Sequence, residues 1–266
     1  MAENGDDDTP EGARESRGIQ SIEVGGRLLL ALVHAGRPMP LKDLAREADM
    51  TPAKAHPYLV SFGKLKLIEQ DPASGRYGLG ALALQLGLIG LQQSDPVRLA
   101  SAELPALALA VGQTVGIAIW GNRGPTFVRL EEGPTAVHVN MRHGTVVSVR
   151  GTASGRLFAA FMPRDEVLAT LRAEAGKAVR IEPAFEAELA GVREQRFSSI
   201  VDGTVRGITA LAAPVFDGFG EMVIALTAIG PSAILDPSRD GAAAQALIGC
   251  AEGLSRRMGA RPAAPT

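Results

Sequence analysis

Two short helical patterns separated by a sharp boundary, within residues 41–65, constrain the fold more than any other feature of this chain. Residues 41–48 place leucine and alanine at the three- to four-residue spacing of one helix face. A second helix begins at Thr51, whose hydroxyl can cap the first turn, and at Pro52, whose missing N–H would have no partner in that turn. This helix extends to about Leu65. The pattern therefore predicts a helix-turn-helix.

The segments on either side extend this motif into a small domain. Apolar residues recur at helical spacing over residues 21–34, although the glycines at 25–26 cost about 1 kcal/mol each relative to alanine unless close packing requires them. Downstream, two strand patterns within residues 67–79 enclose a turn at 71–75. Three helices followed by a hairpin predict a winged helix-turn-helix over residues 18–80.

This order of elements favours DNA binding, because a helix-turn-helix places its second helix in the major groove. The net charge of residues 18–80 is +2, which is weak support. A small three-helix packing module that never contacts DNA is the alternative. The polar residues on and beside the third helix are the candidates for contact with bases and phosphates, with ordinary solvated surface as the competing interpretation. They are Thr51, Lys54, His56, Tyr58, Lys64 and Arg76.

The rest of the chain is predicted to form a connecting helix and a larger α+β domain. The linker helix covers residues 81–96 and has leucines on both faces, so we expect it to be buried against a second copy of the chain or against the next domain. Residues 97–258 begin with one helix over 97–111 and continue as antiparallel hairpins with helices packed on one face. Residues 1–17 are predicted to be a disordered acidic tail, and 259–266 a second tail.

Within the larger domain, hydrophobic patterns separated by turn residues define the expected elements. The expected strands cover residues 115–120, 126–130, 137–141, 207–215 and 222–228. The expected helices after the first one cover residues 152–161, 164–171, 183–195 and 239–258.

Short motifs along residues 18–258 resemble the IclR family of bacterial transcriptional regulators. They are, in order, Ser21-Ile22-Glu23; LKDLAREA at 41–48 with Ala55-His56 and Leu59; GRYGLG at 75–80; TASGR at 152–156; and AAPVFD at 212–217 with Ile229-Gly230-Pro231. No single motif is specific, but their order and spacing together are. The resemblance implies a winged helix-turn-helix DNA-binding domain, a linker helix and a GAF-like effector-binding domain. It also implies dimers or tetramers, and a pseudo-palindromic operator matches that symmetry.

The resemblance further implies that the second domain binds a small effector, often a carboxylic acid. The residues carried over to that site are Val147, Ala153, Ser154, Asp202, Ala210 and Thr227, with Arg150 nearby. A guanidinium can hold a carboxylate through two hydrogen bonds, so Arg150 is a candidate anion anchor; a surface ion pair is the alternative. Asp202 could accept hydrogen bonds from effector hydroxyls or cap the turn at Gly203.

Two departures from the family pattern bear on function. Pro57 stands in the third helix where family members usually have an arginine, and a proline there is expected to kink the helix and alter its contact with DNA. Asp202 is the only acid near the effector motif and Ala210 replaces a cysteine, which makes a small hydrophilic acid a poorer fit. The alternative function is therefore a sensor or interaction protein in which DNA binding has degraded.

Several other function classes find no support in the sequence. There is no phosphate-binding GxxxxGK loop and no GxSxG nucleophile elbow, and the four histidines are dispersed, so we expect no enzyme activity, cofactor or metal. The single cysteine, Cys250, lies in an apolar helical pattern typical of core. The acidic start and the absence of an apolar run of about 20 residues predict a cytoplasmic protein without a membrane span.

Overall fold

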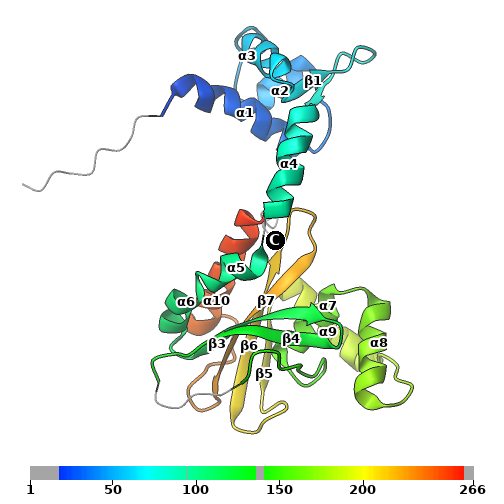
Figure 1. The fold of residues 1–266 in the computed structure, drawn as a ribbon, viewed down its shortest axis with the longest axis vertical. Coiled ribbons are helices and arrows are strands. Elements are labelled where there is room, and N and C mark those ends of the chain that lie inside the picture. Colours follow the sequence, from blue (N-terminus) through cyan, green and yellow to red (C-terminus); the bar gives the residue numbers. More distant parts are fainter. Residues whose placement is uncertain (1–17, 94, 136–140, 261–266) are drawn as a thin grey trace, which may run out of the picture. The chain divides into compact units, whose positions relative to one another are not determined.

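The computed structural model describes residues 18–93, 95–135 and 141–260 (Figure 1). It divides into two compact units, residues 1–93 and 94–266. The predicted tail at 1–17 and most of the tail at 259–266 lie outside the described residues.

The first unit is the predicted winged helix-turn-helix. Its elements are α1 (Gln20–Ala35), α2 (Leu41–Glu47), α3 (Pro52–Lys64), β1 (Ile68–Gln70), β2 (Tyr77–Leu79) and α4 (Ala81–Gln93). The strands β1 and β2 pair antiparallel, and Met39 forms an additional bridge to Tyr77. Leu28, Leu44 and Ile68 are fully buried where the three helices meet the hairpin.

A glycine in α1 allows the close helix packing in this unit. Gly25 is buried, and a Cβ added there would lie 2.8 Å from Cδ1 of Tyr58 and 3.1 Å from Cζ of Phe62. Close packing therefore explains one of the two α1 glycines. Nothing lies within 4 Å of the corresponding position at Gly26.

The helix α4 presents apolar side chains to solvent within its own unit. Leu84, Leu86, Leu88 and Ile89 are all exposed. No charged residue occurs in the helix, and Gln85 is the one polar residue between Ala81 and Leu91. Such a helix needs a partner to cover it, and its burial against a second copy or the next domain stays a prediction.

The second unit is built on a five-stranded antiparallel sheet of order β4-β3-β7-β6-β5. The strands are β3 (Thr114–Gly121), β4 (Gly124–Glu131), β5 (Ser198–Val201), β6 (Ile208–Phe216) and β7 (Met222–Pro231). The helices are α5 (Pro96–Ser101), α6 (Leu104–Val111), α7 (Ala153–Phe161), α8 (Arg164–Ala175), α9 (Pro183–Gln195) and α10 (Ala242–Arg257).

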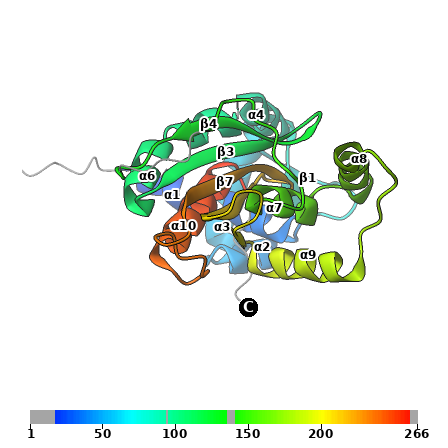
Figure 2. The same cartoon turned by 90° about the horizontal axis from the view of Figure 1, so that it is seen from below.

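Helices cover both faces of this sheet, not one face as predicted. Side chains such as Ile117 and Leu226 pack with α5, α6 and α10 in one core. Side chains such as Ala118 and Ala225, one residue away and therefore on the other face, pack with α7, α8 and α9 in a second core. Both views show α6 and α10 on the opposite side of the sheet from α8 and α9 (Figures 1 and 2).

One further prediction needs correction, one strand was missed, and one predicted strand lies mostly outside the described residues. The single helix expected over 97–111 is two helices, because the chain turns at Ala102-Glu103 and Pro105 begins the next helix at a position suited to a residue without N–H. No strand was predicted over the four residues of β5. Of the strand expected at 137–141, residues 137–140 lie outside the described residues, and Met141 is not in a strand.

Candidate DNA interface and effector cavity

The start of α3 is capped as its sequence predicts. Oγ1 of Thr51 accepts a hydrogen bond from the backbone N–H of Lys54 at 3.3 Å, and Pro52 occupies the first turn. Thr51, Lys54, His56 and Lys64 are all exposed. The cap thus leaves the first turn of α3, with its basic and polar side chains, accessible to an external partner.

Tyr58 differs from the other five predicted DNA-contacting residues. It is half-buried and packs in the core of the unit beside Gly25 of α1. The reason is its position on the helix: Tyr58 follows the buried Ala55 by three residues and precedes the partly buried Phe62 by four, so all three share one face. The structure therefore places Tyr58 in a packing position, although it lies one helical turn after Lys54.

A hollow of about 490 Å³ lies between α3 and the hairpin. His56 lines it from the helix and Gln70 lines it from the strand, together with Lys66 from the connection between them. Lys66 was not among the predicted residues. It has a left-handed backbone with φ 59°, so the chain turns there. The lysine is exposed beside the wing, which is the hairpin of β1 and β2.

The turn of the wing is held by one carboxylate. Asp71 accepts hydrogen bonds from the N–H groups of Ala73 and Ser74 and from the Ser74 hydroxyl. The Ser74 hydroxyl first, and then the Ala73 N–H, lower the pKa of Asp71 below its usual range. The Asp71 N–H also donates to the Arg76 carbonyl at 2.9 Å. These contacts fix the backbone that carries the exposed Arg76.

Pro57 does not divide α3 into two helices. The helix runs without interruption from Pro52 to Lys64, and the Ser61 hydroxyl donates to the Pro57 carbonyl at 3.0 Å. Pro57 itself is exposed. Its ring therefore lies on the open side of a continuous helix.

The second unit contains a cavity of about 280 Å³ against its sheet. Val147, Ser154, Ala210 and Thr227, four of the seven predicted effector residues, line it. The hydroxyl oxygens of Ser154 and Thr227 lie 2.8 Å apart and are buried, which joins α7 to β7. The other lining residues are Phe127, Met141, Thr145, Val146, Ser148, Gly151, Thr152, Ile200, Gly203, Thr204, Val205, Ile208 and Ile229. None of these described residues has an ionisable side chain.

The TASGR motif shapes one wall of this cavity. Thr152 caps α7 by accepting from the Gly155 N–H at 3.0 Å, and its hydroxyl donates to the Ser148 carbonyl at 2.7 Å. A Cβ at Gly155 would lie 2.2 Å from the same Ser148 carbonyl oxygen. The glycine is thus required by backbone contact, and it places Ser154 against the sheet.

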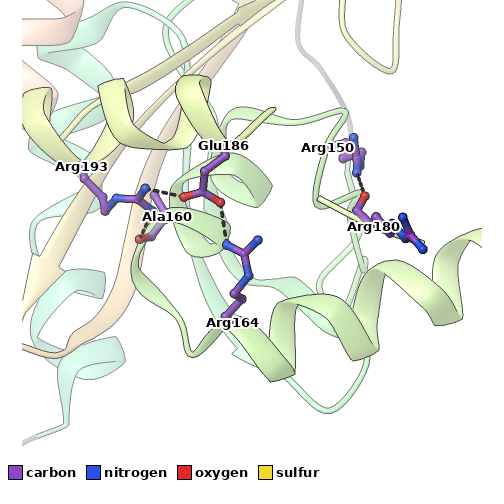
Figure 3. A network of polar contacts seen from close by, with 6 residues as sticks. All are labelled: Arg150, Ala160, Arg164, Arg180, Glu186 and Arg193. Atoms are coloured by element: carbon purple, nitrogen blue, oxygen red, sulfur yellow. Dashed lines mark hydrogen bonds and ion pairs between the residues drawn. The ribbon is translucent and has the colours of Figure 1, made fainter. Parts of the chain in front are cut away.

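Arg150 is not at the cavity. Its guanidinium donates to the Arg180 carbonyl at 3.0 Å (Figure 3). It also pairs with Glu182 at 2.7 Å and lies 4.5 Å from the ring centre of Phe185. The anion-anchor role therefore has no geometric support, and the alternative interpretation, an ion pair, describes this residue.

Asp202 and Ala153 also lie outside the cavity lining. Asp202 has a left-handed backbone with φ 54°, and its carboxylate accepts from the Gly207 N–H at 2.7 Å and the Ser232 hydroxyl at 3.2 Å. Asp202 thus has a structural role, as its predicted alternative has it, but the N–H that it binds belongs to Gly207 and not to the turn at Gly203. Ala153, the first residue of α7, is fully buried in the core. Sequence reasoning missed Thr204 and Val205, whose only signal is the neighbouring Gly203.

Among the described residues, no group of three or more histidine, cysteine or acidic side chains is placed to hold a metal ion. Within the same residues, no helix has both the length and the apolar character needed to cross a membrane.

Comparison with known proteins identifies both units. Residues 21–72 match the model of the IclR helix-turn-helix domain, and residues 90–256 match that of the bacterial transcriptional regulator IclR C-terminal domain. The chain belongs to the IclR family. It is therefore a transcriptional regulator with a DNA-binding helix-turn-helix and a C-terminal effector domain.

Individual relatives in this family align over most of their length. A glycerol operon regulatory protein from Streptomyces griseus is 32% identical over 252 residues, covering 92% of this chain and 98% of the relative. The transcriptional regulator BhcR from Paracoccus denitrificans is 25% identical, covering 94% of this chain and 91% of the relative. The crystal structure of Pseudomonas aeruginosa HmgR superposes with a TM-score of 0.83 at 36% identity, covering 91% of this chain and 99% of HmgR.

Proposed function

We propose that this IclR-family regulator binds a pseudo-palindromic operator through α3 and the wing, and that an effector in the second unit changes its affinity for that operator. Lys54, His56, Lys66 and Arg76 are exposed and can supply donors for bases and phosphates; His56 and Lys66 line the same hollow. The observation that carries the regulatory part is the cavity beside Ser154 and Thr227.

The chemistry of the cavity favours an effector with an apolar body and a hydrogen-bonding group. Val147, Ile208 and Phe127 offer apolar surface, while the paired hydroxyls of Ser154 and Thr227 can each donate or accept. A carboxylic acid clamped by Arg150 is disfavoured, because that guanidinium is held by Glu182.

We further propose that the protein acts as a homodimer or a pair of dimers, with α4 covered by a second copy. The exposed leucines of α4 support this arrangement. A dimer would present two winged helices to two half-sites, which matches a two-fold symmetric operator.

Capture of sheared genomic DNA by the full-length protein, followed by sequencing, tests the DNA-binding part. We expect a few intergenic fragments that share a pseudo-palindrome, with affinity that falls steeply as salt rises. Uniform recovery without steep salt dependence would support the alternative of an interaction protein with degraded DNA binding.

A cavity-filling variant tests the effector part. The operator complex is titrated with a panel of metabolites, including glycerol because two relatives are named glycerol operon regulators. A compound that shifts operator affinity should lose its effect in Ala210→Leu, which occupies the cavity, and keep it in Ala187→Leu on the exposed side of α9. An equal response in both variants would place the effector elsewhere.

A further inference from the structure

The open side of α3 has small apolar residues at its centre. Ala55 and Leu59 are buried against the rest of the unit, whereas Ala53 and Pro57 are exposed. Ala53 and Pro57 are four residues apart, so they are neighbours on the helix surface. The basic Lys54 and the imidazole of His56 flank this pair.

The centre of this face lacks the donors that a DNA-reading helix commonly uses. The side chains of Ala53 and Pro57 have no hydrogen-bonding atom, and Pro57 also has no backbone N–H. The nearby Ser61 hydroxyl donates to the Pro57 carbonyl of its own helix. Apolar contact is therefore the interaction that Ala53 and Pro57 can make with a base edge.

We propose that Pro57, with Ala53 beside it, reads thymine through the C5 methyl group. This inference rests on the proposed binding of DNA by α3. In the major groove the thymine methyl is the apolar feature, whereas the O6 and N7 atoms of guanine require a donor. The proline ring is rigid, so its contact loses almost no side-chain entropy. Each half-site then carries thymine opposite the middle of α3.

Replacement of single thymines by uracil measures this contact, because uracil lacks only the methyl group. The full-length protein first selects duplexes from a randomised pool at low salt, and every thymine of the selected half-site is then replaced in turn. Loss of one buried methyl group is expected to weaken binding about fourfold at one or two positions. The other thymines should tolerate the replacement.

The same scan with Pro57→Ser assigns the contact to the proline. We expect that replacing the central thymine by uracil no longer weakens the binding of this variant. The effect of replacing each of the other thymines should be the same as in the wild type. Pro57→Ala, whose methyl group carries no hydroxyl, should keep part of the penalty and serves if the serine variant binds too weakly to titrate. Gly26→Ala in α1, where nothing lies within 4 Å, is the matched control and should reproduce the wild-type profile.

Two results would overturn the inference: no thymine whose replacement weakens binding, or a central penalty that is unchanged in Pro57→Ser. Failure to select any duplex, together with weak salt dependence, would instead reject the proposed DNA binding itself. The two failures are therefore distinguishable.

Discussion

At the scale of single residues, the adjacent glycines of α1 are expected to respond in opposite directions to alanine. Gly25→Ala gains helix propensity of about 1 kcal/mol but places a Cβ 2.8 Å from the Tyr58 ring, and such overpacking costs about 1–3 kcal/mol. Gly26→Ala gains the same propensity in open space. Urea unfolding should show Gly25→Ala less stable than the wild type and Gly26→Ala more stable; equal shifts would contradict the packing described for Gly25.

Lys54 and Arg76 are expected to affect DNA binding in different ways. Lys54 lies at the start of α3, so Lys54→Ala should weaken operator binding by about 1–3 kcal/mol and relax sequence preference. Arg76 lies on the wing, so Arg76→Ala should weaken all sequences alike and reduce the salt slope. Fluorescence anisotropy at several salt concentrations separates them. Unchanged affinity in Lys54→Ala at matched salt would remove Lys54 from the interface.

The thiol of Cys250 is expected to be unreactive in the folded protein. Burial, assisted by the Glu103 carboxylate, raises its pKa to about 11. At pH 8 the thiolate fraction is then on the order of a hundredfold lower than in the unfolded chain. A chromogenic disulfide reagent should label the native protein correspondingly slowly and the urea-unfolded protein quickly. Equal rates would show that the thiol is accessible and ionised.

Single residues also show how far the sites could be predicted from sequence. The Thr51 cap was predictable because a cap and its helix are local in sequence, whereas the contact of Thr51 and Lys54 with DNA stays a prediction. Arg150 was not, because its partners Glu182 and Phe185 lie about thirty residues away and become neighbours only in the folded chain. The side chain of Asp202 could serve an effector or a turn, and only the contact with Gly207 distinguishes the two.

At the scale of elements, α9 is held to its neighbours by a carboxylate shared between two arginines. Glu186 accepts from Arg193 and from Arg164 at 2.7 Å each, and Arg193 also donates to the Ala160 carbonyl at 3.2 Å (Figure 3). The hydrogen bonds from Arg193 and then Arg164 lower the pKa of Glu186. Glu186 thus connects α9 to α8, and it holds Arg193, which connects α9 to the end of α7.

This arrangement predicts a stability contribution that depends on pH. Because the folded-state pKa is depressed, the contribution is complete above the unfolded-state pKa of about 4.3 and is lost as pH falls through the folded value. The groups are solvent-exposed, so Glu186→Gln should reduce the free energy of unfolding by about 1 kcal/mol or less at pH 7. In acid, the free energies of unfolding of Glu186→Gln and of the wild type should become equal, because Glu186 is then protonated in both states. Glu194→Gln on the same helix is the control, and a deficit independent of pH would contradict this account.

The elements also differ in how well sequence predicted them. Pro183 and Gln195 bound α9 as predicted, since a proline start and a charged face are local signals. The strand β5 has two serines among four residues, too few to show alternation. The nearly continuous burial of β6 and β7 reflects helices on both faces of the sheet, and the near-continuous apolar runs of these strands are the signal that could have indicated it.

At the scale of the whole molecule, the exposed leucines of α4 predict self-association. We expect the wild type to sediment as a dimer or larger species, and Leu88→Arg to shift it towards the monomer, because a charge would be buried at the contact. Gln85→Arg, also in the exposed part of α4, is the matched control and should shift the sedimentation less towards the monomer. A monomeric wild type at micromolar concentration would reject the proposal.

The order of strands in the second unit has a consequence for synthesis on the ribosome. The strand β3 pairs with β7, with Thr114 opposite Ile229, so two central partners are separated by roughly a hundred residues of chain. Translation of that interval takes on the order of ten seconds, during which the apolar β3 has no partner on that side. The first unit, whose contacts are local, can fold during this interval. Nascent chains stalled before β7 should therefore protect the winged helix-turn-helix from protease while leaving the β3–β4 hairpin dependent on chaperones.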